Sequence, residues 1–242
     1  MINFTGAARA IRNITGSPKH MSNFIKSIRC KIKWWLASPE ARRHSMVGPM
    51  REWRKRRDFQ IGFLKQMGLK PQHFLMDIGC GTLRGGIPII ALLEPGHYCG
   101  LESRAEVLAE GEKELAEAGL ENKAPQLIHS PDVAAVSLDR KFDFVWAFSV
   151  LIHMNDEVLD SCLGMVRRHL RDSGAFYANV NLGERADGHW QGFPLIFRSL
   201  RFYEDAAQKN NLHVTDLGKQ KSFIESGVRA MDEKNILKCT AF

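Results

Sequence analysis

The 242-residue sequence predicts an α/β fold in which a mostly parallel sheet carries helices on both faces. Short apolar runs alternate with amphipathic stretches from about residue 74 onward, and no internal repeat is present. Buried parallel strands are apolar along their whole length, whereas crossover helices keep one polar face. The alternation therefore indicates a doubly wound sheet, and seven of the apolar runs are strand candidates.

Each expected element follows from its own pattern. The strand candidates are residues 74–78, 98–101, 126–129, 142–148, 175–180, 212–217 and 236–242. The helix candidates are residues 50–67, 86–93, 103–118, 156–169 and 202–210, and a further helix starts at Ser38-Pro39-Glu40. Because no strong helix separates the last two strands, we expect an antiparallel pair at the sheet edge.

The positive charge is concentrated near the amino terminus. Residues 1–57 hold 14 lysines and arginines against two acids, whereas residues 58–242 hold 20 basic and 25 acidic residues. We therefore divide the chain into a basic amphipathic extension, 1–45, and a folded domain, 46–242. Because the body is not basic, the high net charge gives weak support for a nucleic-acid partner.

Within the extension, apolar residues of segment 21–38 recur at helical spacing with lysines and arginines between them. A helix with this pattern suits an anionic membrane surface, and it suits equally a helix that packs on the body. The absence of acids from the first 39 residues also fits a transit segment. A homodimer formed through these helices remains open.

Composition excludes some classes of protein. No apolar run approaches the roughly 20 residues of a membrane-spanning helix. The five cysteines are scattered, without metal-ligand spacing, which favours reduced thiols in the cytoplasm, with the inner membrane face as a further location. The histidines show no ligand spacing with nearby acids, so we expect no metal site.

The sharpest motif is the glycine-rich turn Asp77–Gly81, which follows an apolar strand. Gly79 and Gly81 allow a tight turn and let a ligand approach the main chain at the carboxyl end of that strand. Two glycines alone fit an ordinary strand-to-helix turn equally well. The next strand ends in Glu102, where a carboxylate can accept hydrogen bonds from both ribose hydroxyls of a nucleotide.

Spacing separates the candidate nucleotides. A dinucleotide site favours Gly-x-Gly-x-x-Gly, whereas Gly81 and Gly85 have three residues between them. The carboxylate of Asp77 would oppose a pyrophosphate but suits a cationic amino-acid moiety. The turn therefore favours S-adenosylmethionine over NAD.

With these motifs, residues 45–242 resemble the class I S-adenosylmethionine-dependent methyltransferases, which have a Rossmann-like fold. Asp77–Gly81 is similar to the family's first motif, and Lys141–Ser149 to its fourth. The resemblance implies S-adenosylmethionine as the cofactor, with the adenine near Ser130 and Asp132. The cofactor-binding residues that it implies are Asp77, Gly79, Cys80, Gly81, Glu102, Ser130, Asp132, Phe148 and Ser149.

A narrower resemblance rests on Val47-Gly48-Pro49 together with Leu83–Gly86. These segments are similar to bacterial methyltransferases that accompany glycan or cell-envelope biosynthesis. Ser130 and Pro131 depart from the family, because glycine is common there before the acid.

Methyl transfer to a hydroxyl requires alignment, exclusion of water and a base. His153, which follows the fourth strand, is the first candidate for the base, and His189, in the polar loop 183–192, is the second. Asn179 and Asn181 flank the end of the fifth strand, where they could bind a substrate hydroxyl.

The leading hypothesis is direct displacement of a methyl group onto a hydroxyl of a small molecule or glycan, including a lipid-linked sugar. One alternative is methylation of nucleic acid or protein, although the body lacks interleaved aromatic and basic residues that would stack bases. The other is a non-catalytic cofactor-binding scaffold whose amino-terminal arm binds a membrane or a partner.

Deleting residues 1–38 should lower binding to vesicles of anionic lipid, because the deletion removes both the basic charge and the apolar helix face. Co-sedimentation of the full-length and truncated chains measures this, with vesicles of neutral lipid as the control. A full-length chain that never sediments with anionic vesicles would refute the membrane interpretation.

Overall fold

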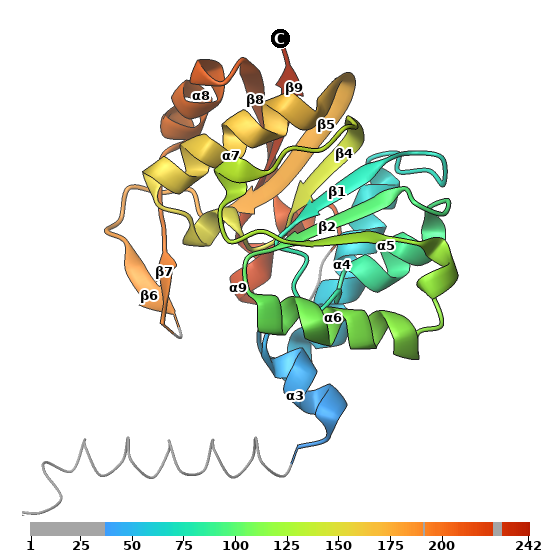
Figure 1. Ribbon diagram of the computed structural model, residues 1–242. Coiled ribbons are helices and arrows are strands. Elements are labelled where there is room, and N and C mark those ends of the chain that lie inside the picture. The colour runs from blue at the N-terminus through green and yellow to red at the C-terminus, as the bar shows by residue number, and fades with distance from the viewer. Residues whose placement is uncertain (1–36, 191, 225–228) are drawn as a thin grey trace, which may run out of the picture. The chain divides into compact units, whose positions relative to one another are not determined.

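The computed structural model describes residues 37–190, 192–224 and 229–242 (Figure 1). Most of the amphipathic segment 21–38 lies outside these residues. The chain divides into two compact units, residues 1–43 and His44–Phe242, and the larger unit contains the sheet.

Seven strands form one sheet in the order β3-β2-β1-β4-β5-β9-β8. Strands β1 to β5 pair in parallel, whereas β9 runs antiparallel to both β5 and β8. The mostly parallel α/β fold is confirmed, and the antiparallel β9 is the inner neighbour of the edge strand β8. The bounds are β1 Leu75–Ile78, β2 Tyr98–Glu102, β3 Gln126–His129, β4 Phe142–Ala147, β5 Leu170–Val180, β8 Leu212–Lys219 and β9 Asn235–Ala241.

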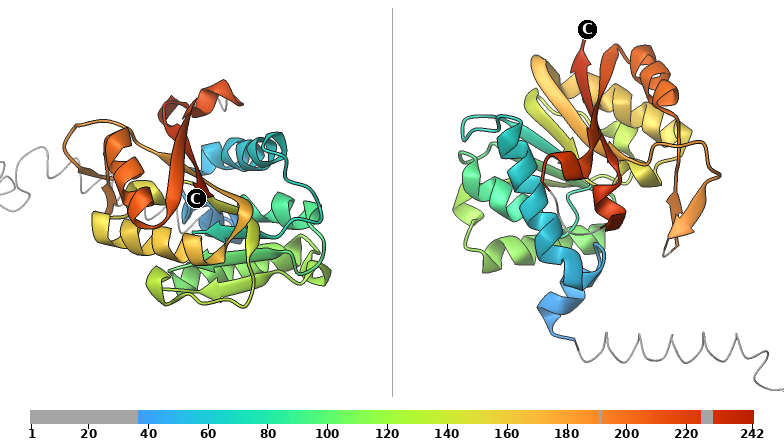
Figure 2. Two further views of the ribbon diagram at one scale, coloured as in Figure 1. Left: turned by 90° about the horizontal axis from the view of Figure 1, so that it is seen from above. Right: turned by 180° about the vertical axis from the view of Figure 1, so that it is seen from behind.

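Helices cover both faces of the sheet (Figures 1 and 2). Helices α7 and α8 pack on one face, and α4, α5 and α6 pack on the other. The α-helices are α3 Pro39–Ser45, α4 Trp53–Gln66, α5 Gly86–Leu92, α6 Ala105–Glu117, α7 Asp156–His169, α8 Leu200–Lys209 and α9 Arg229–Asp232. Short 3-10 turns are η1 Met50–Glu52, η2 Glu121–Lys123, η3 Val133–Ala135, η4 Leu151–His153 and η5 Gln220–Ser222.

Side-chain alternation along the strands divides the core between the two faces. Met76 and Ile78 join the cluster beneath α7 and α8, whereas Leu75 joins the cluster beneath α4, α5 and α6. Successive strand residues point to opposite faces, so a central strand buries all of its side chains only when both faces are covered. All four residues of β1 are buried accordingly.

Capping side chains mark the starts of three helices, α3, α7 and α8. The Ser38 hydroxyl accepts a hydrogen bond from the Ala41 amide at 3.1 Å, which confirms the predicted helix start. Asn155 caps α7 by accepting from the Val158 amide at 2.9 Å, and Ser199 caps α8. The helix predicted over 50–67 begins with the 3-10 turn η1 before α4.

One hairpin was not predicted: β6 Gly188–Trp190 pairs with β7 Phe193–Leu195 in a separate two-stranded sheet. Each strand has only three residues, β6 lies in a polar segment that contains glycine, and β7 contains Pro194, which is uncommon in strands. The hairpin projects beside η4, with which β7 is in contact.

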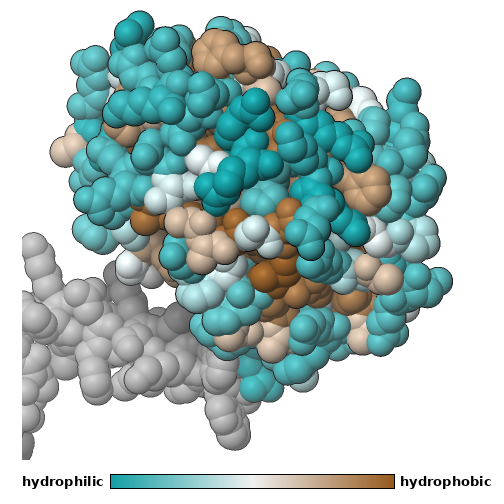
Figure 3. Space-filling view, turned by 45° about the horizontal axis from the view of Figure 1, so that its top comes forward, coloured by the Kyte–Doolittle hydropathy of each residue, from teal (hydrophilic) through white to brown (hydrophobic). Residues whose placement is uncertain are grey.

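Hydrophilic side chains cover most of the face seen in Figure 3, where apolar residues gather in one central patch. Within the described ranges, no helix combines the length and apolar character needed to cross a membrane.

Replacing Phe63 by alanine should lower the free energy of unfolding by about 3–5 kcal/mol. Phe63 on α4 is fully buried, and its ring contacts those of Trp146, Tyr177 and Phe223 at centroid distances of 5.3, 5.6 and 5.1 Å. Urea unfolding measures the change, with Phe242→Ala as the control because Phe242 is 72% exposed. Equal stability of both variants would contradict this core assignment.

Candidate functional site

A cavity of about 1300 Å³ opens at the carboxyl ends of the parallel strands. Its walls come from the turn after β1, the end of β2, the loop after β3 and the segment that follows β4. Residues of the β6–β7 hairpin and of the segment before α4 complete it. Ligands bind at this edge of open α/β sheets, because the loops that leave the strands diverge there.

The glycine turn after β1 forms the floor of the cavity. Gly79 and Gly81 have φ angles of +69° and +60°, a backbone region that favours glycine. A Cβ on Gly79 would lie 2.5 Å from Val150 Cγ2, so a side chain has no room there. The amides of Gly79 and Cys80 both donate to the Leu101 carbonyl, at 2.8 and 3.0 Å, which fixes the turn against β2.

The Glu102 carboxylate lies beside this turn and is only 4% exposed. Its Oε2 accepts from the Gly81 amide at 3.0 Å, and its Oε1 accepts from the amide and Nε of Arg104 at 3.1 and 3.0 Å. A carboxylate offers roughly four acceptor positions. The Ser103 hydroxyl donates to Oε1 as well, at 3.5 Å, so Glu102 organises the turn and retains capacity to accept from a ligand at Oε2.

The Asp77 carboxyl lies at the end of β1 in the same cavity. Its Oδ2 accepts a hydrogen bond from the Tyr98 hydroxyl at 2.7 Å. Burial raises the pKa of Asp77 to about 7, although the hydrogen bond from Tyr98 acts in the opposite direction. A cation bound beside Asp77 would stabilise its ionised form.

The loop after β3 supplies the rim. Ser130 and Val133 line the cavity, whereas Asp132 is exposed and does not. The Asp132 carboxylate accepts from the Ala134 amide at 2.9 Å and thereby caps η3. The predicted adenine contact thus has Ser130 at the cavity wall and Asp132 behind it.

The segment after β4 brings Phe148 and Ser149 to the cavity. Ser149 has a φ of +60°, which is uncommon for a residue with a side chain. Its amide donates to Asn179 Oδ1 at 2.6 Å, and Asn179 Nδ2 donates to Gln220 Oε1 at 3.0 Å. The fully buried Asn179 therefore holds Ser149 in place and does not line the cavity.

His153 also lines the cavity. Its Nδ1 lies 2.5 Å from the Pro194 carbonyl oxygen of the hairpin. Because a carbonyl only accepts, we assign the proton to Nδ1, which leaves Nε2 as the acceptor. Burial lowers the pKa of His153, partly offset by the Pro194 contact, and the charges of Lys234 and Arg104 lower it further.

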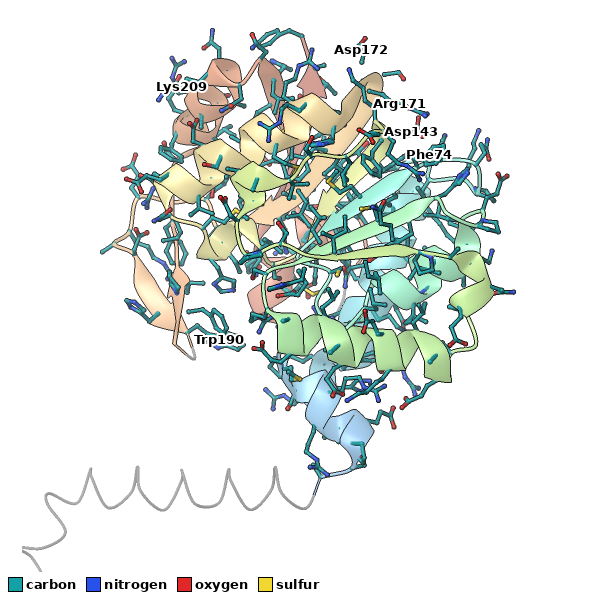
Figure 4. All side chains as sticks on the ribbon, viewed as in Figure 1. Phe74, Asp143, Arg171, Asp172, Trp190 and Lys209 are labelled. Atoms are coloured by element: carbon teal, nitrogen blue, oxygen red, sulfur yellow. The ribbon has the colours of Figure 1, made fainter. Side chains whose placement is uncertain are left out.

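The hairpin supplies aromatic side chains but not the second histidine. Trp190 and Phe193 line the cavity, and Trp190 extends from the hairpin toward the sheet domain (Figure 4). His189 is exposed on β6 and is not among the lining residues. Asn181 does reach the cavity, although its Nδ2 donates to the Ile196 carbonyl at 3.1 Å.

Comparison with known proteins assigns a domain to part of this sequence. Residues 76–176, which include the glycine turn, β2 and β4, match the family model described as "Methyltransferase domain". A search of curated proteins found no match.

Solved structures share the fold. An S-adenosylmethionine-dependent methyltransferase from Clostridium acetobutylicum ATCC 824 is 14% identical, with a TM-score of 0.60 over 78% of this chain and 92% of that one. The glycopeptide N-methyltransferase MtfA, complexed with S-adenosyl-L-homocysteine, is 16% identical, with a TM-score of 0.60 over 76% of this chain and 90% of that one. Magnesium protoporphyrin IX methyltransferase (ChlM) from Synechocystis PCC 6803, with bound S-adenosylmethionine, is 16% identical, with a TM-score of 0.59 over 80% of this chain and 81% of that one.

Residues 76–176 thus match a methyltransferase domain, and the chain shares its fold with S-adenosylmethionine-dependent methyltransferases. Two of the structures named contain S-adenosyl-L-homocysteine or S-adenosylmethionine. In this chain the corresponding cavity combines a turn without a side chain at Gly79 with two buried carboxyl groups, Asp77 and Glu102.

The cavity also contains basic residues that were not predicted as site residues from the sequence: Arg56, Arg84, Arg104, Arg185 and Lys234. Arg84 lies within a motif that the sequence singled out, but nothing in its neighbours showed which way its side chain points. Lys234, just before β9, belongs to no sequence motif that would have indicated a site residue. Its Nζ donates to the Ser149 hydroxyl at 3.3 Å.

Among the residues that the structure describes, no group of three or more His, Cys, Asp or Glu could hold a metal ion. The cysteines described, Cys80, Cys99, Cys162 and Cys239, are free and buried.

Replacing Gly79 by alanine should weaken binding of S-adenosylhomocysteine about tenfold or more, because the added methyl group strains the turn and meets Val150. Gly119→Ala is the matched control. Its φ of +65° imposes similar backbone strain, yet a Cβ there has no neighbour within 4 Å. Isothermal titration should show cofactor affinity retained in the control, and equal affinity in both variants would refute this placement of the site.

Proposed function

We propose that this domain methylates a hydroxyl group of a small molecule or glycan and that His153 accepts the hydroxyl proton. The observation that carries the proposal is the shared cavity. The glycine turn and Glu102 form one wall, and we take the half-buried His153, whose Nε2 can accept a proton, as part of a second wall. A donor and an acceptor held in this one cavity would lie within reach of each other.

Residues along the first wall fit the parts of the cofactor. Glu102 suits the ribose hydroxyls, because it is an acceptor with unused capacity. Asp77 suits the ammonium group, whose charge would favour the ionised carboxylate. Gly79, Cys80 and Gly81 provide close main-chain approach, and Ser130, Phe148 and Ser149 extend the wall toward the adenine. Asp132 remains a prediction from sequence.

The second wall supplies the base, which methyl transfer from a sulfonium to a hydroxyl requires. S-adenosylmethionine, when bound, provides a methyl group whose bond to sulfur breaks, with the electron pair remaining on sulfur, as the bond to the acceptor oxygen forms. A hydroxyl attacks poorly while it keeps its proton. The Nε2 of His153 accepts that proton, and the Pro194 carbonyl stabilises the resulting imidazolium through its contact with Nδ1.

The walls also favour an acceptor with a flat apolar face. Trp190, Phe193 and Phe197 line the cavity, and aromatic rings pack well on the apolar face of a sugar or of a ring system. Two structural neighbours are a glycopeptide N-methyltransferase and a magnesium protoporphyrin IX methyltransferase. Both are consistent with an acceptor that is a small molecule or a glycan. An association with cell-envelope biosynthesis, and with an inner membrane surface through segment 21–38, rests on sequence alone.

The rate of methyl transfer should depend on pH through His153. Only the neutral imidazole accepts a proton, and burial lowers the pKa of His153 from its ordinary 6.5. We therefore expect kcat to be constant above pH 6.5 and to fall as the pH drops through the lowered pKa. Transfer of a labelled methyl group from S-adenosylmethionine to fractionated cell extract provides the assay.

In the same assay, His153→Gln should lower kcat about 100-fold and abolish the acidic fall in rate. The matched control is His213→Gln, because His213 is exposed on β8 and remote from the cavity. A His153→Gln enzyme that keeps both the rate and the acidic limb would show that another group, or none, accepts the proton.

A further inference from the structure

Three cationic side chains that the proposed methyl transfer does not use line the same cavity. Arg56 comes from α4, Arg84 from the loop before α5, and Lys234 from the turn before β9. We refer to these three residues as the cation cluster. They are distant in the sequence, so only the fold brings them together.

Arg84 is the innermost member of the cation cluster. It is 7% exposed, and its Nη1 donates to the Val47 carbonyl at 2.6 Å. Its Nε is buried and has no hydrogen-bond partner. A buried charged donor without a partner is costly, so it indicates a place where an acceptor is expected. Burial, followed by the charge of Arg56, lowers the pKa of Arg84 to about 9.

Gly48 leaves space between the two guanidinium groups. A Cβ on Gly48 would lie 3.7 Å from Arg84 Nη1 and 3.9 Å from Arg56 Nη1. The φ angle of Gly48 is +125°, so a residue with a side chain would be strained there. The missing side chain leaves a position that both guanidinium groups approach, large enough for an atom of a ligand.

Lys234 contributes to the same positive field. Burial, followed by the charges of Arg56 and Arg84, lowers its pKa to about 7. All three side chains line the same cavity, so one ligand within it can meet more than one of them. The Ser149 hydroxyl accepts a hydrogen bond from Nζ, but it supplies no negative charge.

The acids near the cation cluster balance only part of its charge. Glu52 pairs with Arg56 at 2.8 Å, whereas the carboxylate of Glu233 pairs with Lys221. Asp77, with its raised pKa, is only partly ionised at neutral pH, and its proposed partner is the ammonium group of the cofactor. An acidic group on a second ligand would supply negative charge to Arg84 and Lys234.

We propose that the acceptor carries an acidic group, a carboxylate or phosphate, which binds between Arg84, Arg56 and Lys234. This inference rests on the proposed function and specifies its substrate class. The acidic group accepts from the free Nε of Arg84 or from the Nη1 atoms that approach Gly48, and Lys234 adds charge from the Ser149 side. Binding through this group would position the acceptor hydroxyl near His153.

The test uses the full-length protein saturated with S-adenosylhomocysteine, with inorganic phosphate as the probe in calorimetric titrations at low ionic strength. We expect phosphate to bind this complex. Arg84→Met and Lys234→Met should each weaken phosphate binding about tenfold, because each variant removes a charged donor. Lys234→Arg should retain affinity within about threefold, because it keeps the charge.

Lys209→Met is the matched control, because Lys209 is an exposed lysine at the end of α8, remote from the cavity (Figure 4). It should leave phosphate affinity unchanged, including any phosphate bound by the basic amino-terminal extension. If Lys234→Met and Lys209→Met bind phosphate equally, the proposal is refuted, even if Arg84→Met fails to fold.

A second arm separates the acceptor from the cofactor's own carboxylate. Methylthioadenosine lacks the amino-acid moiety. If phosphate binds the methylthioadenosine complex but not the S-adenosylhomocysteine complex, the cation cluster serves the cofactor's carboxylate, and the proposal is overturned. If the wild-type protein binds phosphate but not S-adenosylhomocysteine, the proposed function fails instead.

Discussion

The buried carboxylate of Glu102 is the interaction on which the site depends. It joins the end of β2 to the glycine turn after β1 through the Gly81 amide, and it fixes Arg104 at the cavity wall. An unpartnered carboxylate at this depth would be strongly destabilising, so the turn and the acid require each other. The same group is the natural acceptor for ribose hydroxyls, so the structural and cofactor-binding roles of Glu102 coincide.

The two walls of the cavity differ in origin. The cofactor wall is built from strand ends and the turn that joins them, which the packed sheet holds rigidly. The proposed acceptor wall comes from the β6–β7 hairpin, from His153 at the end of η4 and from the segment before α4. Loops of this kind carry the specificity of many folds, so the acceptor has to be inferred from the side chains of one cavity.

Much of the fold was predictable, because most of its strands are apolar runs and three of its helices, α3, α7 and α8, start at capping side chains. The β6–β7 hairpin was not, since its strands have three residues each and pack through long-range contacts such as those of β7 with η4. The same limit applied to the site. Glu102 could be predicted because it ends the strand that follows the glycine turn in the sequence. Lys234 could not, because only long-range packing brings it to the cavity. His189 and Asn179 lay in the right segments, but their side chains point elsewhere.

The most direct measurement is a crystal structure of the protein with S-adenosylhomocysteine. We expect the ribose hydroxyls within 3.2 Å or so of the Glu102 carboxylate, the usual hydrogen-bond range, and the amino-acid end beside Asp77 and Gly79. The sulfur should then face the side of the cavity that contains His153. A ligand bound elsewhere, or an unliganded cavity at saturating concentration, would contradict the assignment of this cavity to methyl transfer.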